Sequence, residues 1–283
     1  MNLLALDIGG TAVKYGCFGK EEVFGLFSVK DENGFENLPE KIMHFISDHS
    51  ADCVGICAPG PFDFESGTGL MEHKLPSLYQ VSLRKMIQDQ FPNTELFFIH
   101  DATAFVLGTI QNNPTLSKEN IAGIMLGTGL GYIHCINGCV EVNSKKTPLH
   151  PLWNMPYRDG IAEQYVSATA IINKAKKAGY HFNGVKEIAI EARRGNVQLK
   201  EVLLETGVQL GELIDIKRKE DSFDKLVIGG QVSLAWDLMR DGFERLCEIP
   251  YEVFKDPTVC SLFGIRYCAE NGVETIYMKG ESS

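Results

Sequence analysis

The sequence predicts an α/β fold of two similar lobes that face a common cleft. A buried strand, a glycine turn and a second strand open the chain at 3–18, and the same order recurs at 121–136. Each hairpin is followed by a third strand, at 22–29 and at 139–142, and then by helices and buried strands. Two copies of one unit, each with a glycine hairpin after its first strand, therefore predict two related lobes.

The first hairpin carries residues that suit a phosphate group. An apolar run at 3–6 is typical of a strand buried on both faces, and Asp7 follows where such a strand surfaces. Gly9 and Gly10 leave the backbone free to adopt positive φ and to approach a ligand, and a second strand starts at once. The backbone N–H groups and the Thr11 hydroxyl suit phosphate oxygens, and Asp7 suits a hydrated magnesium ion. An ordinary Gly-Gly hairpin with a polar strand end accounts for the same residues.

Apolar periodicity and turn residues place the other elements. Strands are expected at 53–58, 95–99 and 224–228, and helices at 35–46, 80–91, 102–111, 160–178, 199–216, 232–246 and 258–270. The polar, proline-rich stretch at 143–158 is expected to be a surface loop. We expect one lobe at 1–110, with a C-terminal helix at 260–283 packing back on it, and a second lobe at 111–259.

Composition excludes several classes of protein. The net charge of −10 over 283 residues argues against nucleic acid as the main partner, because phosphate binding needs a basic face. No apolar run approaches the ~20 residues that span a bilayer, and no signal peptide is visible. The eight cysteines lie mostly in apolar runs and form no Cys-x-x-Cys pair. We therefore expect reduced, buried thiols and a cytoplasmic protein with no membrane contact.

A carboxylate at the end of a predicted strand is a candidate general base. Asp101 follows the strand at 95–99, and ligands gather at such strand ends in open sheets. Its carboxylate suits removal of a proton from a poorly nucleophilic hydroxyl as a phosphoryl group departs. Asp101 also suits the N-cap of a helix that starts at Ala102. The two roles are compatible.

Five motifs resemble those of the ROK family of sugar kinases and sugar-responsive repressors, and their order and spacing match over nearly the whole chain. They are Asp7-Ile8-Gly9-Gly10-Thr11, Gly60-Pro61-Phe62-Asp63, His100-Asp101-Ala102-Thr103-Ala104, Leu126-Gly127-Thr128-Gly129-Leu130-Gly131 and Ile228-Gly229-Gly230-Gln231-Val232-Ser233. The resemblance implies an actin-like, hexokinase-like (ribonuclease H-like) pair of lobes. It also implies that the chain transfers the γ-phosphoryl group of ATP to a sugar hydroxyl, with Asp101 as the catalytic base.

The resemblance also implies the binding residues. ATP and Mg²⁺ are the implied cofactors, with Asp7 holding Mg²⁺ through water. The implied nucleotide-binding residues are Asp7, Gly9, Gly10, Thr11, Lys14, Gly127, Thr128, Gly129, Gly229 and Gly230. The implied sugar-binding residues are Gly60, Lys74, His100, Asp101, His150 and Glu163.

Several positions depart from the family pattern. His100 stands where the family commonly has asparagine, and Lys74 stands where relatives often place a sugar-binding asparagine. The segment 146–150 keeps only the histidine of the family's Gly-Glu-x-Gly-His motif, and 153–161 contains none of the usual zinc cysteines. We therefore expect no structural zinc. His150 is then either a substrate contact or a solvated loop residue.

Two functions from different classes follow. The first is an ATP-dependent kinase acting on a hexose or a hexose derivative, such as a glucose-like or N-acyl amino sugar. The alternative is a non-catalytic regulator that binds sugar or nucleotide and acts through a partner. The N-terminal DNA-binding domain of the family's repressors has no counterpart here, so we expect no nucleic-acid partner. A homodimer is possible, because relatives are often dimers.

Overall fold

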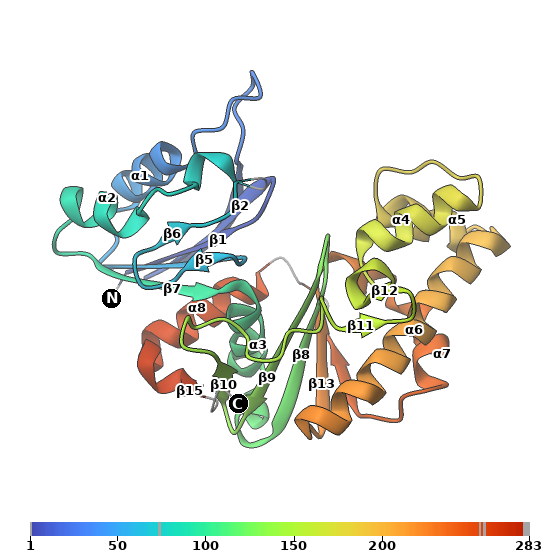
Figure 1. The fold of residues 1–283 in the computed structure, drawn as a ribbon. Helices are drawn as coiled ribbons and strands as arrows, with labels where there is room; N and C mark the ends of the chain where they lie inside the picture. The colour runs from blue at the N-terminus through green and yellow to red at the C-terminus, as the bar shows by residue number, and fades with distance from the viewer. Residues whose placement is uncertain (1, 73–74, 255, 257–258, 280–283) are drawn as a thin grey trace. The chain divides into compact units, whose positions relative to one another are not determined.

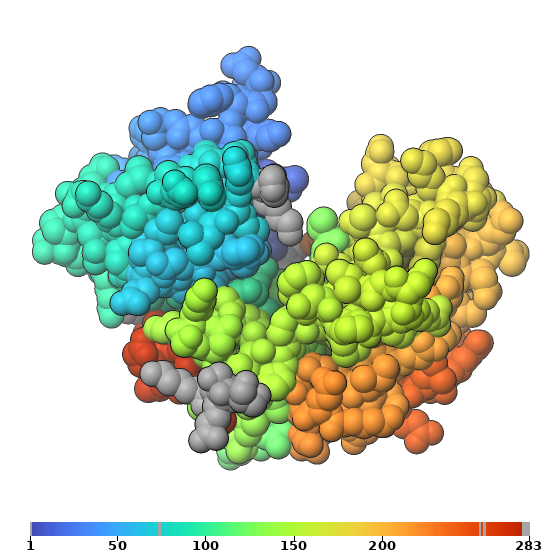
Figure 2. All heavy atoms as spheres, viewed as in Figure 1, coloured from blue at the N-terminus to red at the C-terminus, as the bar shows by residue number. Residues whose placement is uncertain are grey.

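A computed structural model describes residues 2–72, 75–254, 256 and 259–279. The chain forms two compact units (Figure 1). Unit 1 comprises 1–115, 138–149 and 258–283, and unit 2 comprises 116–137 and 150–257. Within each unit the side chains fill the space between the ribbons (Figure 2). No helix in the described part of the chain is long and apolar enough to cross a membrane.

Unit 1 is built on a five-stranded sheet of order β3-β2-β1-β4-β7, in which β1, β4 and β7 are parallel and β2 and β3 antiparallel to their neighbours. Its strands are β1 (Leu3–Ile8), β2 (Ala12–Phe18), β3 (Glu22–Ser28), β4 (Cys53–Ala58), β5 (Phe62–Asp63), β6 (Thr68–Gly69), β7 (Glu95–His100), β10 (Cys139–Val142) and β15 (Tyr277–Lys279). Its helices are α1 (Leu38–His49), η1 (Pro76–Leu78), α2 (Leu83–Gln90), α3 (Asp101–Asn112), α8 (Cys260–Asn271) and η5 (Val273–Ile276).

Unit 2 contains the first four strands of the sheet β14-β13-β8-β9-β10-β15, whose last two strands are grouped with unit 1. Its strands are β8 (Asn120–Leu126), β9 (Leu130–Ile136), β11 (Pro156–Tyr157), β12 (Gly160–Ile161), β13 (Lys225–Gly229) and β14 (Tyr251–Val253). Its helices are η3 (Ala162–Gln164), α4 (Ala168–Lys177), α5 (Val185–Arg193), α6 (Val197–Asp221), η4 (Gln231–Ala235) and α7 (Trp236–Glu244), and η2 (Pro114–Lys118) spans the unit boundary.

The predicted internal repeat is confirmed by the strand order. The series β3-β2-β1-β4-β7 of the first sheet corresponds to the series β10-β9-β8-β13-β14 of the second. In both, an antiparallel hairpin follows the first strand of the repeat, and the next strand pairs parallel to that first strand. The predicted α/β fold class is therefore correct.

A helix pair covers one face of the first sheet at very short range. Helices α3 and α8 pack on each other, and α8 also contacts β1 and β4. A Cβ atom on Gly264 would overlap the carbonyl oxygen of Ala104, and one on Gly108 would overlap that of Cys260. Glycine is required at both positions because the two backbones touch. The opposite face carries α1 and α2, whose buried residues include Ile42 and Ile87.

The predicted helix over 160–178 is wrong in its first half. Residues 160–161 form β12, which pairs antiparallel with β11, so the predicted loop at 143–158 also ends in a strand. The helix α4 begins only at Ala168, where the Ser167 side chain accepts a hydrogen bond from the N–H of Ala170. This N-cap satisfies an amide that an uninterrupted helix would have bonded to its own backbone, and it fixes the helix start. Helix α5 and strands β14 and β15 were not predicted.

Candidate functional site

The candidate site of unit 1 lies at the carboxyl ends of its parallel strands. Asp7 near the end of β1 is the register partner of Cys57 on β4, and Ala58 is that of His100 at the end of β7. Because β1, β4 and β7 run parallel, the residues that follow them emerge at one edge of the sheet. The first glycine hairpin, the Gly60 loop and Asp101 all start from this edge.

Asp7 is buried, and its carboxylate contacts three side chains. Its carboxylate is paired with Lys14, whose Nζ lies 3.0 Å from Oδ2, and Lys14 is its partner across the β1–β2 ladder. The hydroxyl of Ser261, on α8, donates to the same oxygen at 2.6 Å, and the Cys57 thiol lies 3.4 Å from Oδ1. A cation and a hydroxyl donor of this kind compensate the cost of burying a carboxylate. The structure thus supplies two partners, Ser261 and Cys57, that the sequence analysis did not predict.

The pKa values of Lys14 and Cys57 both depend on the charge of Asp101 as well as on that of Asp7. Burial lowers the pKa of the Lys14 ammonium, but the charge and hydrogen bond of Asp7 outweigh it, and Asp101 adds to the rise. Burial raises the pKa of the Cys57 thiol well above its usual value, and the charges of Asp7 and Asp101 raise it further. Lys14 therefore stays cationic, and Cys57 stays a neutral thiol. The negative charges of Asp7 and Asp101 both stabilise the Lys14 ammonium.

The first glycine turn does not use the positive φ that its glycines allow. Neither Gly9 nor Gly10 has a positive φ. The Gly9 N–H donates to the Ala12 carbonyl at 3.0 Å, and a Cβ on Gly9 would lie 2.9 Å from that oxygen, so close approach of the chain favours glycine there. Nothing lies within 4 Å of a Cβ on Gly10. Gly10 and Thr11 are exposed, which leaves this part of the turn accessible to a ligand.

Helix α3 begins at Asp101 itself, and its N-cap is His100, which corrects the expected start at Ala102. The Ala102 N–H lies 3.1 Å from His100 Nδ1 and 2.7 Å from Asp101 Oδ1. His100 Nδ1 and Asp101 Oδ1 are 2.9 Å apart, so a protonated Nδ1 would donate to the carboxylate, whereas an unprotonated Nδ1 accepts from Ala102. Both side chains are partly exposed at the helix N-terminus. This position stabilises a carboxylate.

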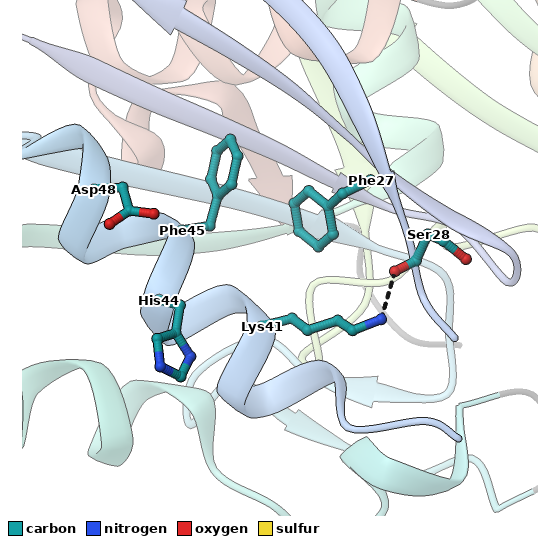
Figure 3. A pocket seen from close by; sticks show the side chains of 6 residues that line it. All are labelled: Phe27, Ser28, Lys41, His44, Phe45 and Asp48. Atoms are coloured by element: carbon teal, nitrogen blue, oxygen red, sulfur yellow. Dashed lines mark hydrogen bonds between the residues drawn. The ribbon is translucent and has the colours of Figure 1, made fainter. Parts of the chain in front are cut away.

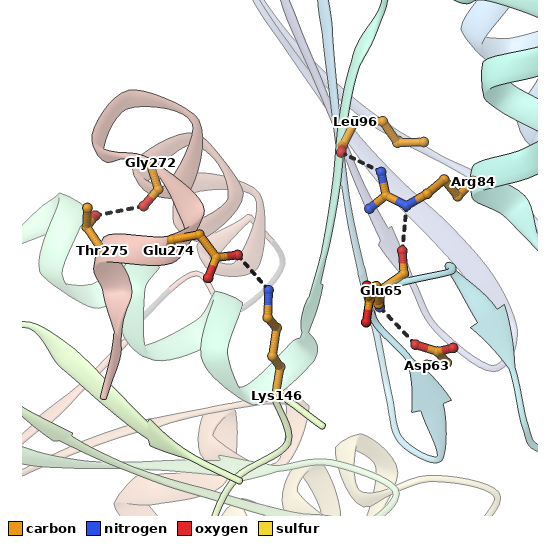
Figure 4. Close-up of polar contacts among 8 residues, drawn as sticks. All are labelled: Asp63, Glu65, Arg84, Leu96, Lys146, Gly272, Glu274 and Thr275. Atoms are coloured by element: carbon orange, nitrogen blue, oxygen red, sulfur yellow. Dashed lines mark hydrogen bonds and ion pairs between the residues drawn. The ribbon is translucent and has the colours of Figure 1, made fainter. Parts of the chain in front are cut away.

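The Gly60 loop closes over His100. A Cβ on Gly60 would lie 3.4 Å from His100 Nε2, and the ring of Phe64 lies 5.6 Å from that of His100. Asp63 shapes the following turn, since its carboxylate accepts a hydrogen bond from the N–H group of Glu65 (Figure 4). The same carboxylate accepts from the N–H group of Ser66. The Ser66 hydroxyl bond is the main cause that lowers the pKa of Asp63. Asp63 is therefore a structural residue of this loop.

Arg84 fixes the far side of the same loop. Its guanidinium donates to the carbonyls of Glu65 and Leu96 (Figure 4). The guanidinium also lies over the ring of Phe98, 5.2 Å from the centroid. The loop is thus attached to β7, the strand that carries His100. Lys74, the predicted sugar ligand on the next segment, lies outside the described residues.

The second glycine turn, in unit 2, is attached to Glu163 and α4. The Gly127 N–H donates to the Gly129 carbonyl at 3.0 Å, and Ala168 at the start of α4 donates its N–H to the Gly127 carbonyl at 2.8 Å. Glu163 Oε2 accepts the N–H of Leu130 at 2.9 Å, and a Cβ on Gly129 would lie 2.5 Å from that oxygen. The structure therefore brings the predicted sugar ligand Glu163 against the predicted phosphate turn. Glycine at 129 makes room for it.

The predicted adenosine glycines lie against the same turn. Gly229 at the end of β13 is the register partner of Met125 on β8. Gly230 has φ +87°, and a Cβ there would overlap the Leu126 carbonyl just before the Gly127 turn. Gly230 is thus required both by its left-handed backbone and by space. The Ser233 hydroxyl donates to the Gly230 carbonyl at 2.8 Å and holds the start of η4.

His150 has a partner that neither predicted role foresaw. Its Nδ1 lies 3.5 Å from Oδ1 of Asp221, a buried carboxylate at the end of α6. The other oxygen of Asp221 accepts from the Tyr132 hydroxyl at 2.6 Å and pairs with buried Lys217 at 3.1 Å. His150 remains half exposed. One ring nitrogen of His150 is therefore held by Asp221. A substrate contact through the exposed part of the ring stays a prediction.

Metal ligation by protein side chains alone has no candidate in the described ranges. No group of three histidine, cysteine, aspartate or glutamate side chains there could hold a metal ion. A hydrogen bond and an ion pair fix the segment that carries Glu163. The Glu163 N–H donates to the Trp153 carbonyl at 3.0 Å, and Arg158 pairs with Glu212 of α6 at 3.1 Å. Tyr157 donates its hydroxyl to the same Glu212 carboxylate.

Comparison with known proteins gives a family match and a shared fold. The ROK family model matches residues 3–142. An N-acetyl-D-glucosamine kinase from Photobacterium profundum is 27% identical over 132 residues, which cover 44% of this chain and 43% of that protein. The chain matches half or less of the length of its curated relatives.

Two solved structures show the same fold at low identity. A ROK family glucokinase from Streptomyces griseus, in complex with glucose and AMPPNP, has TM-score 0.77 and 18% identity, covering 96% of this chain and 100% of that one. A ROK family transcriptional regulator, a homologue of the E. coli MLC protein, has TM-score 0.75 and 18% identity, covering 95% of this chain and 78% of that one. At these identities the likeness establishes the hexokinase-like fold and leaves the activity open.

Proposed function

Through residues 3–142 this chain belongs to the ROK family, and from this premise we propose that it is an ATP-dependent sugar kinase. The observation that carries the proposal is the grouping of Asp7, Lys14 and Asp101 at one edge of the first sheet. It provides a carboxylate, a fixed cation and a second carboxylate beside an exposed glycine turn. We place the reaction in the cytoplasm, with a hexose or an N-acylated hexosamine as substrate, in keeping with the kinases that this chain resembles.

In the proposed reaction Asp101 accepts the proton of the sugar hydroxyl as that hydroxyl attacks the γ-phosphorus of ATP. The oxygen–phosphorus bond to the sugar forms while the bond to ADP breaks, and Lys14 stabilises negative charge on the phosphate oxygens. Asp7 orients Lys14, and Ser261 orients Asp7. The exposed N–H groups of the first turn bind phosphate oxygens.

Asp7 also fits a hydrated Mg²⁺ ion. Its Oδ2 is occupied by Lys14 and Ser261, whereas Oδ1 has only the weakly donating Cys57 thiol at 3.4 Å and can accept from a metal-bound water. When bound, Mg²⁺ would neutralise charge on the ATP phosphates. In unit 2 the Gly127, Thr128 and Gly129 turn is proposed to bind phosphate, and Gly229 and Gly230 the adenosine. The proposal includes no structural zinc.

For the sugar we propose contacts from Gly60, His100, Asp101, His150 and Glu163. His100 presents Nε2 toward the Gly60 loop, and its ring is held by Phe64. An imidazole in this place can donate or accept with a hydroxyl or an acyl group. This residue is therefore a candidate determinant of which sugar is accepted.

The test is a screen for sugar-dependent ADP formation with Mg-ATP. We expect turnover with at least one of glucose, N-acetylglucosamine and N-acetylmannosamine, and a matching rise in melting temperature when that sugar is added, because a ligand that binds the folded state stabilises it. Absence of turnover with a broad hexose panel, together with stabilisation by sugar or nucleotide, would instead support the non-catalytic regulator. Absence of both would refute the proposed site.

Replacement of Glu163 by glutamine is expected to raise KM for the sugar several-fold and to lower kcat less. The amide still accepts the Leu130 N–H, so the turn is preserved, but the negative charge that would hold a sugar hydroxyl is lost. Steady-state kinetics with varied sugar at saturating Mg-ATP measure the effect. Glu201→Gln, at an exposed position of α6, is the matched control and should change neither constant. A fall in kcat with an unchanged KM for sugar would show that Glu163 acts on the nucleotide turn.

A further inference from the structure

Lys174, on α4, directs its amine at two neutral side chains of α6. Its Nζ donates to the Thr206 hydroxyl at 3.1 Å and to the side-chain oxygen of Gln209. Both partners are buried and use their own donors elsewhere, because the Thr206 hydroxyl donates to the Val202 carbonyl. The Gln209 amide group likewise donates to Glu205. No carboxylate in the described part of the chain forms an ion pair with Lys174. The amine is therefore fixed in place without a direct counterion.

This site suits a neutral amine better than an ammonium. An ammonium has three N–H donors, whereas Thr206 and Gln209 offer two acceptors. A neutral amine donates to both and keeps its lone pair on the remaining side. Burial lowers the pKa of Lys174 to about 8, while the charge of Glu205 on α6 raises it and that of Arg158, in the β11–β12 hairpin, lowers it. A lysine with a lowered pKa is an activated nucleophile near neutral pH.

We propose that Lys174 is a modification site that takes an acyl group from a small acyl phosphate. The Lys174 nitrogen attacks the acyl carbon, and a nitrogen–carbon bond forms. The carbon–oxygen bond to phosphate breaks, inorganic phosphate leaves with the electron pair of that bond, and the surplus proton of the amine passes to water. The amide product carries no charge, so the cost of burying an ammonium disappears. Its remaining N–H can still donate to Thr206 or Gln209.

The charges near Lys174 favour an anionic acyl donor. Lys176 and Lys177 lie on the same last turn of α4 and are exposed. Arg158 is exposed as well, its charge acts on Lys174, and only one of its nitrogens is paired with Glu212. Positive charge of this kind raises the local concentration of anions. Because Lys174 is only partly exposed, its surroundings restrict access to small donors.

Lys41, on α1, is a matched lysine for comparison. It donates to the Ser28 and Val29 carbonyls, both at 3.1 Å, so it also has two neutral acceptors. It lines a shallow groove of about 430 Å³ between β3 and α1 (Figure 3). Its contact with Ser28 is exposed, so water can supply the third acceptor that Lys174 lacks. Comparison of the two lysines therefore isolates the effect of burial.

The test is incubation of the full chain with acetyl phosphate from about pH 6.5 to 9.5, with initial rates for each lysine from mass spectrometry of its peptides. At pH 7.5 a lysine with a pKa of about 8 has a neutral fraction about 10² times that of an ordinary lysine. Partial burial offsets some of this gain, so we expect Lys174 to react about tenfold faster than Lys41, Lys176 and Lys177. Its rate should level off above about pH 8, because the amine is then mostly neutral.

Two variants of α6 test the role of the neutral partners. Gln209→Glu sets a carboxylate against Nζ and stabilises the ammonium, so acetylation of Lys174 at pH 7.5 should fall about tenfold. Glu205→Gln, at an exposed position, is the opposite change and should move the midpoint of the pH profile to lower pH. Lys176 and Lys177 should keep their rates in both variants. Circular dichroism melting shows whether each variant is folded.

Arg158→Gln tests the class of donor. Rates with acetyl phosphate and with uncharged p-nitrophenyl acetate are measured on the same protein, and their ratio does not depend on the pKa of Lys174. This ratio should fall several-fold in the variant, and an unchanged ratio would overturn the acyl phosphate as the donor. A Lys174 that reacts no faster than Lys41, Lys176 and Lys177 overturns the modification site. A folded Gln209→Glu that keeps the parent rate overturns it equally, and none of these measurements uses kinase activity.

Discussion

Asp101→Asn is expected to lower kcat for sugar phosphorylation by about 10²- to 10⁴-fold, the range for loss of a general base. The asparagine Oδ1 still accepts the Ala102 N–H that Asp101 accepts at 2.7 Å, so helix α3 should keep its start. The variant loses the capacity to accept the hydroxyl proton. It also loses the negative charge of Asp101, which acts on Lys14. The measurement is kcat for the sugar identified in the screen, together with calorimetric titration of a non-hydrolysable ATP analogue.

Nucleotide affinity should change little in this variant, because the glycine turns are untouched. Asp89→Asn, at an exposed position of α2, provides the matched control and should retain the parent rate. If Asp101→Asn phosphorylates sugar at the parent rate, the carboxylate serves only the helix N-terminus. If the variant also melts well below the parent, the loss of rate is to be assigned to lost stability. The melting temperature is therefore measured alongside.

Gly264→Val is expected to destabilise the chain by about 3 kcal/mol, the upper end of the range for overpacking, or to prevent folding of unit 1. The Cβ of any residue at 264 would overlap the Ala104 carbonyl, which belongs to the backbone of α3 and cannot move as a side chain can. The two helices would have to separate. Because α8 also presents Ser261 to Asp7, their separation would disturb the site as well.

Urea denaturation followed by circular dichroism measures this effect. Gly10→Ala is the control, since nothing lies within 4 Å of a Cβ there and φ is not left-handed; its free energy of unfolding should stay within about 1 kcal/mol of the parent. Gly264→Ala should fall between the two. Equal stability of Gly264→Val and the parent would show that α3 and α8 do not pack backbone to backbone.

The local sequence was sufficient for much of the fold. Strands 53–58 and 139–142 have the predicted bounds, because apolar runs between turn residues define short strands without reference to the rest of the chain. The repeat of a glycine hairpin after a buried strand likewise predicted two related units, and the matching strand orders of the two sheets agree with it. The strands β14 and β15 escaped prediction because each is only three residues long and owes its conformation to a distant parallel partner.

The sequence by itself determined which residues end the strands, and tertiary structure alone decided what those residues touch. Asp7 follows from a buried strand that turns polar, but its partner Ser261 lies 254 positions away on α8, which packs against α3, β1 and β4. Likewise Glu163 meets the second glycine turn, and His150 meets Asp221, through contacts across 33 and 71 residues of chain. Local periodicity carries no information on such pairs, because burial and hydrogen bonding between distant segments are settled only when the whole core assembles.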